Sequence, residues 1–117
     1  MIGSTRQVRA FAYNRPTDMR RSYDGLCALV TDALGRDPLS GDLFLFVGKD
    51  RRRAKVVYWD GTGLCVFAKR LEQGRFSAPW RAPPGRTMQW TMTELQLFLE
   101  GSDLVGKIDL SPAEFVI

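Results

Sequence analysis

Apolar and polar positions predict a hairpin in the middle of the chain. Within residues 56–67, two runs of β-branched and aromatic residues flank the sequence Asp-Gly-Thr-Gly at 60–63. Glycine adopts the positive φ angles of a tight turn, so both glycines of this turn are expected to have them. The apolar run 43–47 has the same strand character and is joined to the hairpin through 48–53. The pattern therefore predicts a three-stranded antiparallel meander at the centre of a sheet.

A helical periodicity precedes this meander. Apolar residues recur at helical spacing and form one stripe: Tyr23, Leu26, Cys27, Val30, Ala33 and Leu34. Thr17 or Ser22 can cap the start of the helix, and Gly35 is expected to end it. Because the stripe places Cys27 on the buried face, the pattern favours a structural thiol over a reactive one.

Weaker patterns flank these elements on both sides. Residues 8–13 alternate weakly and predict a short strand, for which a sheet edge is a candidate position. Residues 88–92 predict a last strand that rejoins the sheet. Thr93 and Gln96 fit a capping box, which predicts a short second helix that Gly101 ends.

These elements predict an α+β fold, with an antiparallel β-meander sheet of four to five strands packed by one main helix and a short C-terminal helix. The 117 residues suit one domain, 1–117. Only a weak strand pattern, at 108–110, follows the second helix, so 102–117 is expected to be a mobile tail.

Composition narrows the class of protein. No apolar run approaches the roughly 18 residues of a membrane span, and the N-terminus lacks the apolar segment of a secretory signal. The sequence therefore predicts a soluble, cytoplasmic protein without membrane contact. Two cysteines form at most one disulfide, and in a reducing compartment both are expected to be small buried hydrophobes.

Charge is distributed unevenly along the chain. Residues 49–86 hold ten Lys or Arg against three Asp or Glu, whereas residues 87–117 hold one Lys against five Asp or Glu. This asymmetry predicts a surface for a polyanion in the middle of the chain and a separate role for the end. The candidate nucleic-acid-binding residues are Lys49, Arg51, Arg52, Arg53, Lys55, Lys69, Arg70 and Arg75.

Aromatic residues add a second, weaker indication. Bases can stack on aromatic rings, and five candidates lie in or near the basic region: Tyr58, Trp59, Phe76, Trp80 and Trp90. A core role is favoured for these rings. A solvated loop is the alternative for the triple arginine, for which a functional role is favoured.

The sequence offers little for catalysis. It contains no histidine, which excludes histidine-based acid–base pairs and most zinc sites. A magnesium site is the alternative for four carboxylates: Asp18, Asp24, Asp42 and Asp60. A helix first turn explains Asp24 and a tight turn explains Asp60 structurally. We therefore expect no enzyme activity, no cofactor and no metal.

Six stretches of this sequence resemble the TnpB accessory proteins of the IS-sixty-six class of bacterial insertion sequences: 16–26, 37–41, 58–63, 69–72, 74–76 and 99–101. The pairing of Pro-Thr-Asp-Met-Arg with Tyr-Trp-Asp-Gly-Thr-Gly is the most specific part of the resemblance. It implies a protein encoded beside a transposase and needed for efficient transposition, with no catalytic residues to transfer. The family motifs mark seven positions as a candidate surface: Asp18, Arg20, Asp24, Tyr58, Trp59, Asp60 and Arg70.

Three functions remain open from the sequence. The first is a non-enzymatic accessory protein that binds DNA together with the transposase. The second is an adaptor that binds only the transposase and uses its basic face for an acidic partner. The third, ranked last, is a component of a metal-dependent nuclease. The oligomeric state is left open.

Overall fold

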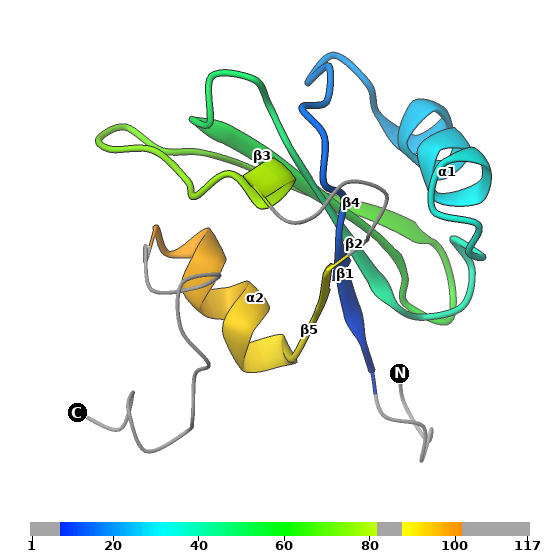
Figure 1. Ribbon diagram of the computed structural model, residues 1–117. Helices are drawn as coiled ribbons and strands as arrows, with labels where there is room; N and C mark the ends of the chain where they lie inside the picture. Colours follow the sequence, from blue (N-terminus) through cyan, green and yellow to red (C-terminus); the bar gives the residue numbers. More distant parts are fainter. Residues whose placement is uncertain (1–7, 82–87, 102–117) are drawn as a thin grey trace.

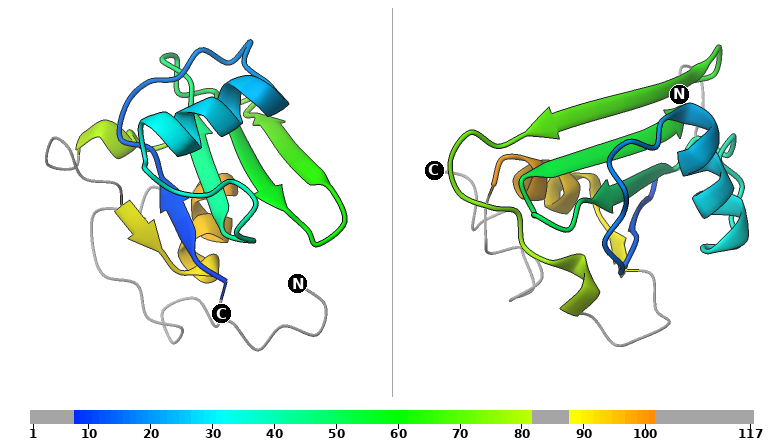
Figure 2. Two further views of the ribbon diagram at one scale, coloured as in Figure 1. Left: turned by 90° about the vertical axis from the view of Figure 1, so that its right-hand side faces the viewer. Right: turned by 90° about the horizontal axis from the view of Figure 1, so that it is seen from above.

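In the computed structural model, the described residues are 8–81 and 88–101, and they form a sheet with a helix on each face (Figures 1 and 2). Along the chain the elements are β1 (Ala10–Ala12), α1 (Tyr23–Asp32), β2 (Leu43–Val47), β3 (Arg53–Trp59), β4 (Leu64–Arg70), the 3₁₀ turn η1 (Pro79–Arg81), β5 (Met88–Trp90) and α2 (Met92–Leu99). Within the described residues the sheet has five strands in the order β4-β3-β2-β1-β5. The predicted α+β class is confirmed.

The meander is confirmed, whereas the prediction of a wholly antiparallel sheet is wrong. β2, β3 and β4 pair antiparallel in sequence order. β1, however, pairs parallel with β2, and the sheet is therefore mixed. A parallel neighbour requires a long crossover, and the chain between β1 and β2 supplies one that contains α1 (Figure 1).

The first strand is not at an edge of the sheet. β1 lies between β2 and β5, and all three of its residues, Ala10, Phe11 and Ala12, are buried. Alternation of polar and apolar residues is weak there because packed side chains cover both faces of this strand. The edge strands among the described residues are β4 and β5.

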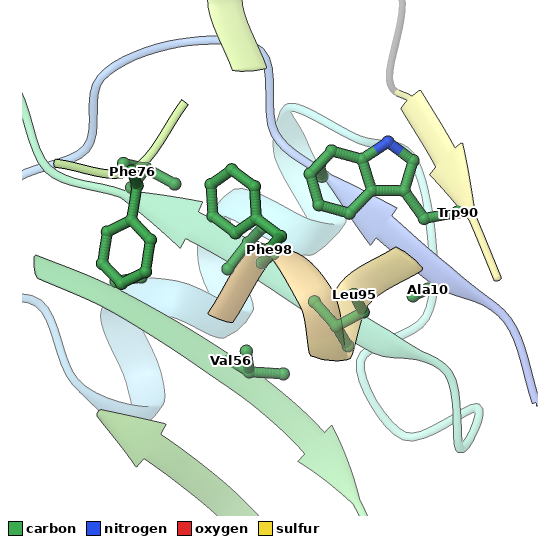
Figure 3. Close-up of a cluster of buried hydrophobic side chains, with 10 residues drawn as sticks. Ala10, Val56, Phe76, Trp90, Leu95 and Phe98 are labelled. Atoms are coloured by element: carbon green, nitrogen blue, oxygen red, sulfur yellow. The ribbon is translucent and has the colours of Figure 1, made fainter. Parts of the chain in front are cut away.

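Side chains of the central strands alternate between two cores. On the face covered by α2, Leu45 and Val56 join Phe76, Trp90 and residues of the helix (Figure 3). The ring centroids of Phe76 and Phe98 are 5.2 Å apart, and those of Trp90 and Phe98 are 5.0 Å apart. The core role favoured for Phe76 and Trp90 is therefore confirmed.

The second core lies under α1. Phe44, Phe46 and Val57 point to this face and pack with Leu26 and Val30 of the helix. Each of these five side chains is fully buried. The sheet therefore separates two apolar layers, which fixes the direction of every strand side chain.

The start of α1 is at Ser22 and not at Thr17. Ser22 is the N-cap residue, although its side chain makes no capping hydrogen bond. Thr17 is buried instead, and its N–H donates to the carbonyl oxygen of Val47 at 2.9 Å. Asp24 lies in the first turn of the helix as predicted, whereas Tyr23, the first residue of the apolar stripe, is half exposed.

The helix ends one residue earlier than a C′ glycine at position 35 implies. Its C-cap is Ala33, and Gly35 follows with a φ of 62°. The chain turns back there, because the N–H of Arg36 donates to the carbonyl oxygen of Val30 at 3.0 Å. Cys27 is half-buried, and burial raises the pKa of its thiol.

The predicted cap of α2 is wrong by two residues. Thr91 is the N-cap: its Oγ1 accepts from the N–H of Glu94 at 3.1 Å, and Glu94 Oε1 accepts from the N–H of Thr91 at 2.9 Å. Thr91 and Thr93 both begin a capping-box pattern in the sequence. Trp90 is still in β5 and buried, so Thr91 is the first residue able to leave the strand.

Some predictions concern residues outside the described ranges. These are the weak strand at 108–110 and the tail at 102–117. Within the described ranges, neither helix has the length and apolar composition needed to cross a membrane.

Candidate nucleic-acid interface

The loop between β2 and β3 has a fixed backbone shape. The N–H of Gly48 donates to the carbonyl oxygen of Arg53 at 2.9 Å, and the N–H of Arg51 donates to that of Gly48 at 2.9 Å. Arg51 has a φ of 59°, uncommon for a residue with a side chain. Asp50 Oδ1 accepts from the N–H of Arg52 at 3.0 Å, and this bond holds the pKa of Asp50 below its ordinary value. The loop therefore displays its cations from a defined backbone.

The end of β4 and the chain after it lie against this loop. The N–H of Leu71 donates to the carbonyl oxygen of Arg52 at 2.7 Å, and that of Phe76 donates to the carbonyl oxygen of Arg51 at 2.6 Å. Arg75 precedes Phe76 and is exposed. Two basic segments, about 20 residues apart in sequence, thus form one surface.

A third segment joins the same end of the sheet. Met19 is buried, and a Cβ built on Gly48 would lie 2.7 Å from its Cγ. Lys55 Nζ donates to the carbonyl oxygen of Arg21 at 2.8 Å. The sequence motif that contains Asp18 and Arg20 is therefore packed beside the basic loop, although no local pattern in the sequence predicts this contact.

These three segments form what we call the basic end. Its cationic residues are Arg20, Arg21, Lys49, Arg51, Arg52, Arg53, Lys55, Arg70 and Arg75. Most are exposed, whereas Arg51 and Lys55 are half-buried. Of these, Arg21 was not predicted.

Lys69 has a partner within the protein that its charge alone does not predict. Its Nζ donates to the carbonyl oxygen of Leu99 at 2.6 Å, on the α2 side of the sheet. Leu99 is the last residue of α2, where a cation satisfies a terminal carbonyl and offsets the helix dipole. The structure therefore gives Lys69 a structural partner, as the Arg21 carbonyl does for Lys55.

Arg53 and Arg70 lie directly opposite each other on β3 and β4. Arg53 Nε lies 3.4 Å from Asp50 Oδ2, and Arg70 Nε lies 3.0 Å from Glu72 Oε2. All four side chains are about half exposed or more, so each ion pair is worth about 0–1 kcal/mol. Arg53 belongs to the strand and not to the tip of the loop, where the sequence had placed it.

A hollow of about 390 Å³ opens beside these two arginines. We call it the Arg53–Arg70 pocket, and it is lined by Met19, Arg53, Ala54, Lys55, Ala68, Lys69, Arg70 and Glu72. The hollow combines cations with the apolar surface of Met19 and Ala68. One carboxylate, that of Glu72, is among its lining groups.

Asp18 and Arg20 form an exposed two-pronged ion pair. Arg20 Nε and Nη2 donate to the two Asp18 carboxylate oxygens at 3.0 and 2.8 Å. These hydrogen bonds hold the pKa of Asp18 well below its ordinary value and raise that of Arg20. The pair lies at the exposed corner next to Met19.

The remaining motif residues lie at the opposite end of β3. Tyr58 and Trp59 finish the strand and Asp60 opens the turn, so they lie about 20 Å from Arg53 by strand geometry. The structure therefore does not bring Tyr58, Trp59 and Asp60 together with the basic end. Asp24 lies in the first turn of α1, three residues after Arg21 of the basic end.

Asp60 organises this turn as predicted. Its Oδ1 accepts from the N–H groups of Thr62 and Gly63, each at 2.8 Å, and from the Thr62 hydroxyl at 3.0 Å. These bonds lower its pKa to about 2. Gly61 has a φ of 103°, but Gly63 is not among the positive-φ residues, so the prediction for the second glycine is wrong.

The four carboxylates considered for magnesium have separate surroundings. Asp42 is buried and pairs with Arg9, whose Nη2 lies 3.2 Å from Asp42 Oδ2. Asp18 is paired at the basic end, Asp24 is on α1, and Asp60 is in the turn. In residues 8–81 and 88–101, no three His, Cys, Asp or Glu side chains are grouped so that they could hold a metal ion.

Comparison with known proteins shows the family to which this chain belongs. The family model described as IS66 Orf2 like protein matches residues 8–107. Two similar proteins come from Sinorhizobium fredii (strain NBRC 101917 / NGR234). The uncharacterized protein y4jC is 44% identical over 79 residues, 68% of each chain. The uncharacterized protein y4hO is 36% identical over 103 residues, 88% of each chain. No solved structure matches the chain.

Proposed function

Because the chain belongs to the family of IS66 Orf2 like proteins, we propose that it is an accessory protein of transposition and that its basic end binds DNA. The family model and the sequence motifs agree on an insertion-sequence context. The DNA-binding step is our proposal. It rests on one observation, the convergence of three cationic segments at one end of the sheet.

The electrostatics of this end favour a polyanion. Asp18, Asp50 and Glu72 each pair with one arginine, and the six other cations of the basic end outnumber these three carboxylates. Exposed guanidinium groups neutralise phosphates and release the counterions that surround DNA. A compact basic surface also steers a polyanion during diffusion.

Binding to DNA of the element's terminal repeats tests the proposal, with and without the transposase. We expect the protein alone to bind, with a log–log salt slope of about −0.9 for each phosphate neutralised. A variant that combines Arg51→Asn, Arg52→Ala and Arg53→Gln should flatten this slope. Asn is chosen at Arg51 because it tolerates a φ of 59° better than alanine.

Arg36→Gln is the matched control for lost positive charge. Arg36 lies over the ring of Phe11, with its Cζ 3.8 Å from the ring centroid, and follows the C-terminal end of α1. Removing the Arg36 charge should weaken DNA binding less than the loop variant does for each charge that it removes. Equal effects per charge, or no DNA binding at low salt, would contradict the proposal.

A protein-interaction adaptor is the second candidate, and an apolar hollow favours it. The hollow, about 200 Å³ in volume, lies between β4 and α2 and is lined by Leu43, Val56, Tyr58, Phe67, Leu95 and Leu99. Phe67 is 45% exposed on the edge strand β4. The adaptor would be supported if the wild-type protein associates with the transposase and the Phe67→Ser variant does not. Neither the wild-type protein nor the variant would then bind DNA.

We also propose that the protein alone is not a nuclease. Its sequence has no histidine, and the four candidate carboxylates serve separate local roles. Supercoiled plasmid incubated with magnesium or manganese should stay intact. Nicking that disappears in Asp18→Ala or Asp60→Ala would overturn this proposal.

A further inference from the structure

Two arginines face each other where strand pairing usually avoids like charges. Arg53 and Arg70 are direct partners in the antiparallel register of β3 and β4. Their Cβ atoms are therefore about 4.5–5.5 Å apart, and like charges at such positions destabilise a sheet. Among the described residues, exposed ion pairs offset this repulsion: Arg53 with Asp50 at 3.4 Å and Arg70 with Glu72 at 3.0 Å.

The space beside the arginines has the chemistry of an anion site. The Arg53–Arg70 pocket holds about 390 Å³ and includes Lys55 two residues along β3 from Arg53. Lys55 already donates to the Arg21 carbonyl, so it contributes charge while its position is fixed. Met19 and Ala68 add apolar wall beside these cations. A low-polarity wall strengthens the attraction between an anion and the guanidinium groups.

We propose that this pocket holds one backbone phosphate of bound DNA, gripped by Arg53 and Arg70 together. This inference rests on the proposed DNA binding and names the contact within it. A guanidinium presents its donors in a planar fork that matches phosphate oxygens, and two forks on opposite strands grip one phosphate from both sides. The phosphate removes the repulsion between the arginines, which the free protein offsets only weakly.

Asp50 and Glu72 then act as internal competitors of the phosphate. Each arginine exchanges an exposed carboxylate for the DNA, and the carboxylate returns when the DNA leaves. Glu72 lines the pocket, whereas Asp50 also accepts a backbone hydrogen bond within the β2–β3 loop. Glu72→Gln is therefore the cleaner variant, and we expect it to tighten DNA binding.

A double-mutant cycle on a mixed-sequence DNA duplex tests whether the arginines share one phosphate. Arg53→Gln and Arg70→Gln should each weaken binding about tenfold or more, as expected for a charged hydrogen bond. The double variant should be little weaker than either single variant, because one shared contact is lost once. The salt slope should fall by about 0.9 in all three variants.

Arg52→Gln and Arg75→Gln form the control pair, since both are exposed and neither lines the pocket. Their effects on affinity should multiply in the double variant. If the losses of DNA affinity multiply in the Arg53/Arg70 pair as they do in the control pair, the two arginines do not share one phosphate. That result would overturn this inference but not DNA binding by the basic end. Failure of the wild-type protein to bind DNA would instead reject the proposed function.

Inorganic phosphate separates these two failures. At constant ionic strength, replacing chloride by phosphate should raise the melting temperature of the wild-type protein more than that of the Arg53→Gln/Arg70→Gln variant. An equal rise in both proteins is general salt exclusion and would overturn the anion site. A selective rise without any DNA binding would identify an anion site that does not serve nucleic acid, which overturns the proposal as stated.

Discussion

Met19 lies so close to Gly48 that a Cβ built on the glycine would be 2.7 Å from the Met19 Cγ. Real Cβ atoms essentially never come this near to a neighbour, so the contact requires glycine. It joins the Pro-Thr-Asp-Met-Arg segment to the basic loop, two parts of the sequence about 30 residues apart. The shape of the basic end therefore depends on the absence of a Cβ atom at Gly48.

Gly48→Ala should destabilise the protein by about 1–3 kcal/mol, as overpacking a filled site does. The φ of Gly48 is not positive, so the cost comes from the contact and not from the backbone. Urea unfolding measures the change. Gly63→Ala is the matched control, because its added Cβ meets no atom within 4 Å. Equal stability of the Gly48→Ala and wild-type proteins would contradict the contact.

The two glycines of the β3–β4 turn should respond differently to valine. Gly61 has a φ of 103°, where a β-branched residue is strained, so Gly61→Val should cost about 1–3 kcal/mol of stability. Gly63 is not among the positive-φ residues and has open space around it, so Gly63→Val should cost less. Thermal unfolding of the two variants compares them directly. A larger loss at Gly63 would show that the turn has another conformation.

Asp60 should make stability depend on pH in the acid range. Its folded pKa of about 2 lies below the ordinary value of about 3.9. The stabilisation is therefore fully present above about pH 4 and is lost as the pH falls through 2. In Asp60→Asn the amide oxygen still accepts hydrogen bonds but does not titrate. The stability difference between the wild-type protein and this variant should therefore shrink between pH 5 and pH 2.

Urea midpoints across this pH range measure the effect of Asp60. Thr62→Ala removes the hydroxyl that donates to Asp60 Oδ1 and keeps the N–H donors of residues 62 and 63, so it should retain part of the pH dependence. A difference between wild type and Asp60→Asn that stays constant with pH would contradict the assignment. Reduced transposition in cells by an Asp60→Asn variant that remains folded at neutral pH would indicate a functional surface at this turn. Full transposition would leave the turn as scaffold.

The capping box of α2 predicts different effects of alanine at Thr91 and at Thr93. Thr91→Ala removes the oxygen that accepts from the Glu94 N–H, so it should cost about 1 kcal/mol. Thr93 is exposed inside the helix, so Thr93→Ala should change stability by less than about 0.5 kcal/mol. Chemical denaturation of both variants measures the difference. A larger loss of stability in Thr93→Ala than in Thr91→Ala would instead indicate that Thr93 is the N-cap, as the sequence pattern predicted.

Local patterns in the sequence predicted the parts of the fold that neighbouring residues decide. The β2–β3–β4 meander, the buried Leu26 and Val30 of the α1 stripe and the turn bonds of Asp60 were correct, because strand periodicity and turn chemistry act over a few residues. The place of β1 was wrong. Its partners lie more than 30 residues away in β2 and about 80 residues away in β5, and three residues are too few to carry a pairing signal.

The candidate site was predictable as a charge excess but not as an arrangement. The run at 51–53 is visible in the sequence, whereas its contact with Met19 and its register opposite Arg70 depend on tertiary pairing. The partner of Lys69 was also hidden, because the C-terminal end of α2 is 30 residues away. Charge composition therefore overestimates how many of these cations are available to a ligand.

The position of β1 also has a kinetic consequence. β2, β3 and β4 pair with their neighbours in sequence, whereas β1 inserts between β2 and β5, whose register joins Ala10 to Trp90. Contacts so distant in sequence pay a large loop-closure entropy before they stabilise the chain, which slows folding. We expect the meander to form in the folding transition state and the pairing of β1 with β5 to form last. Because the basic end borders the meander, we expect it to form before β1 pairs within the sheet.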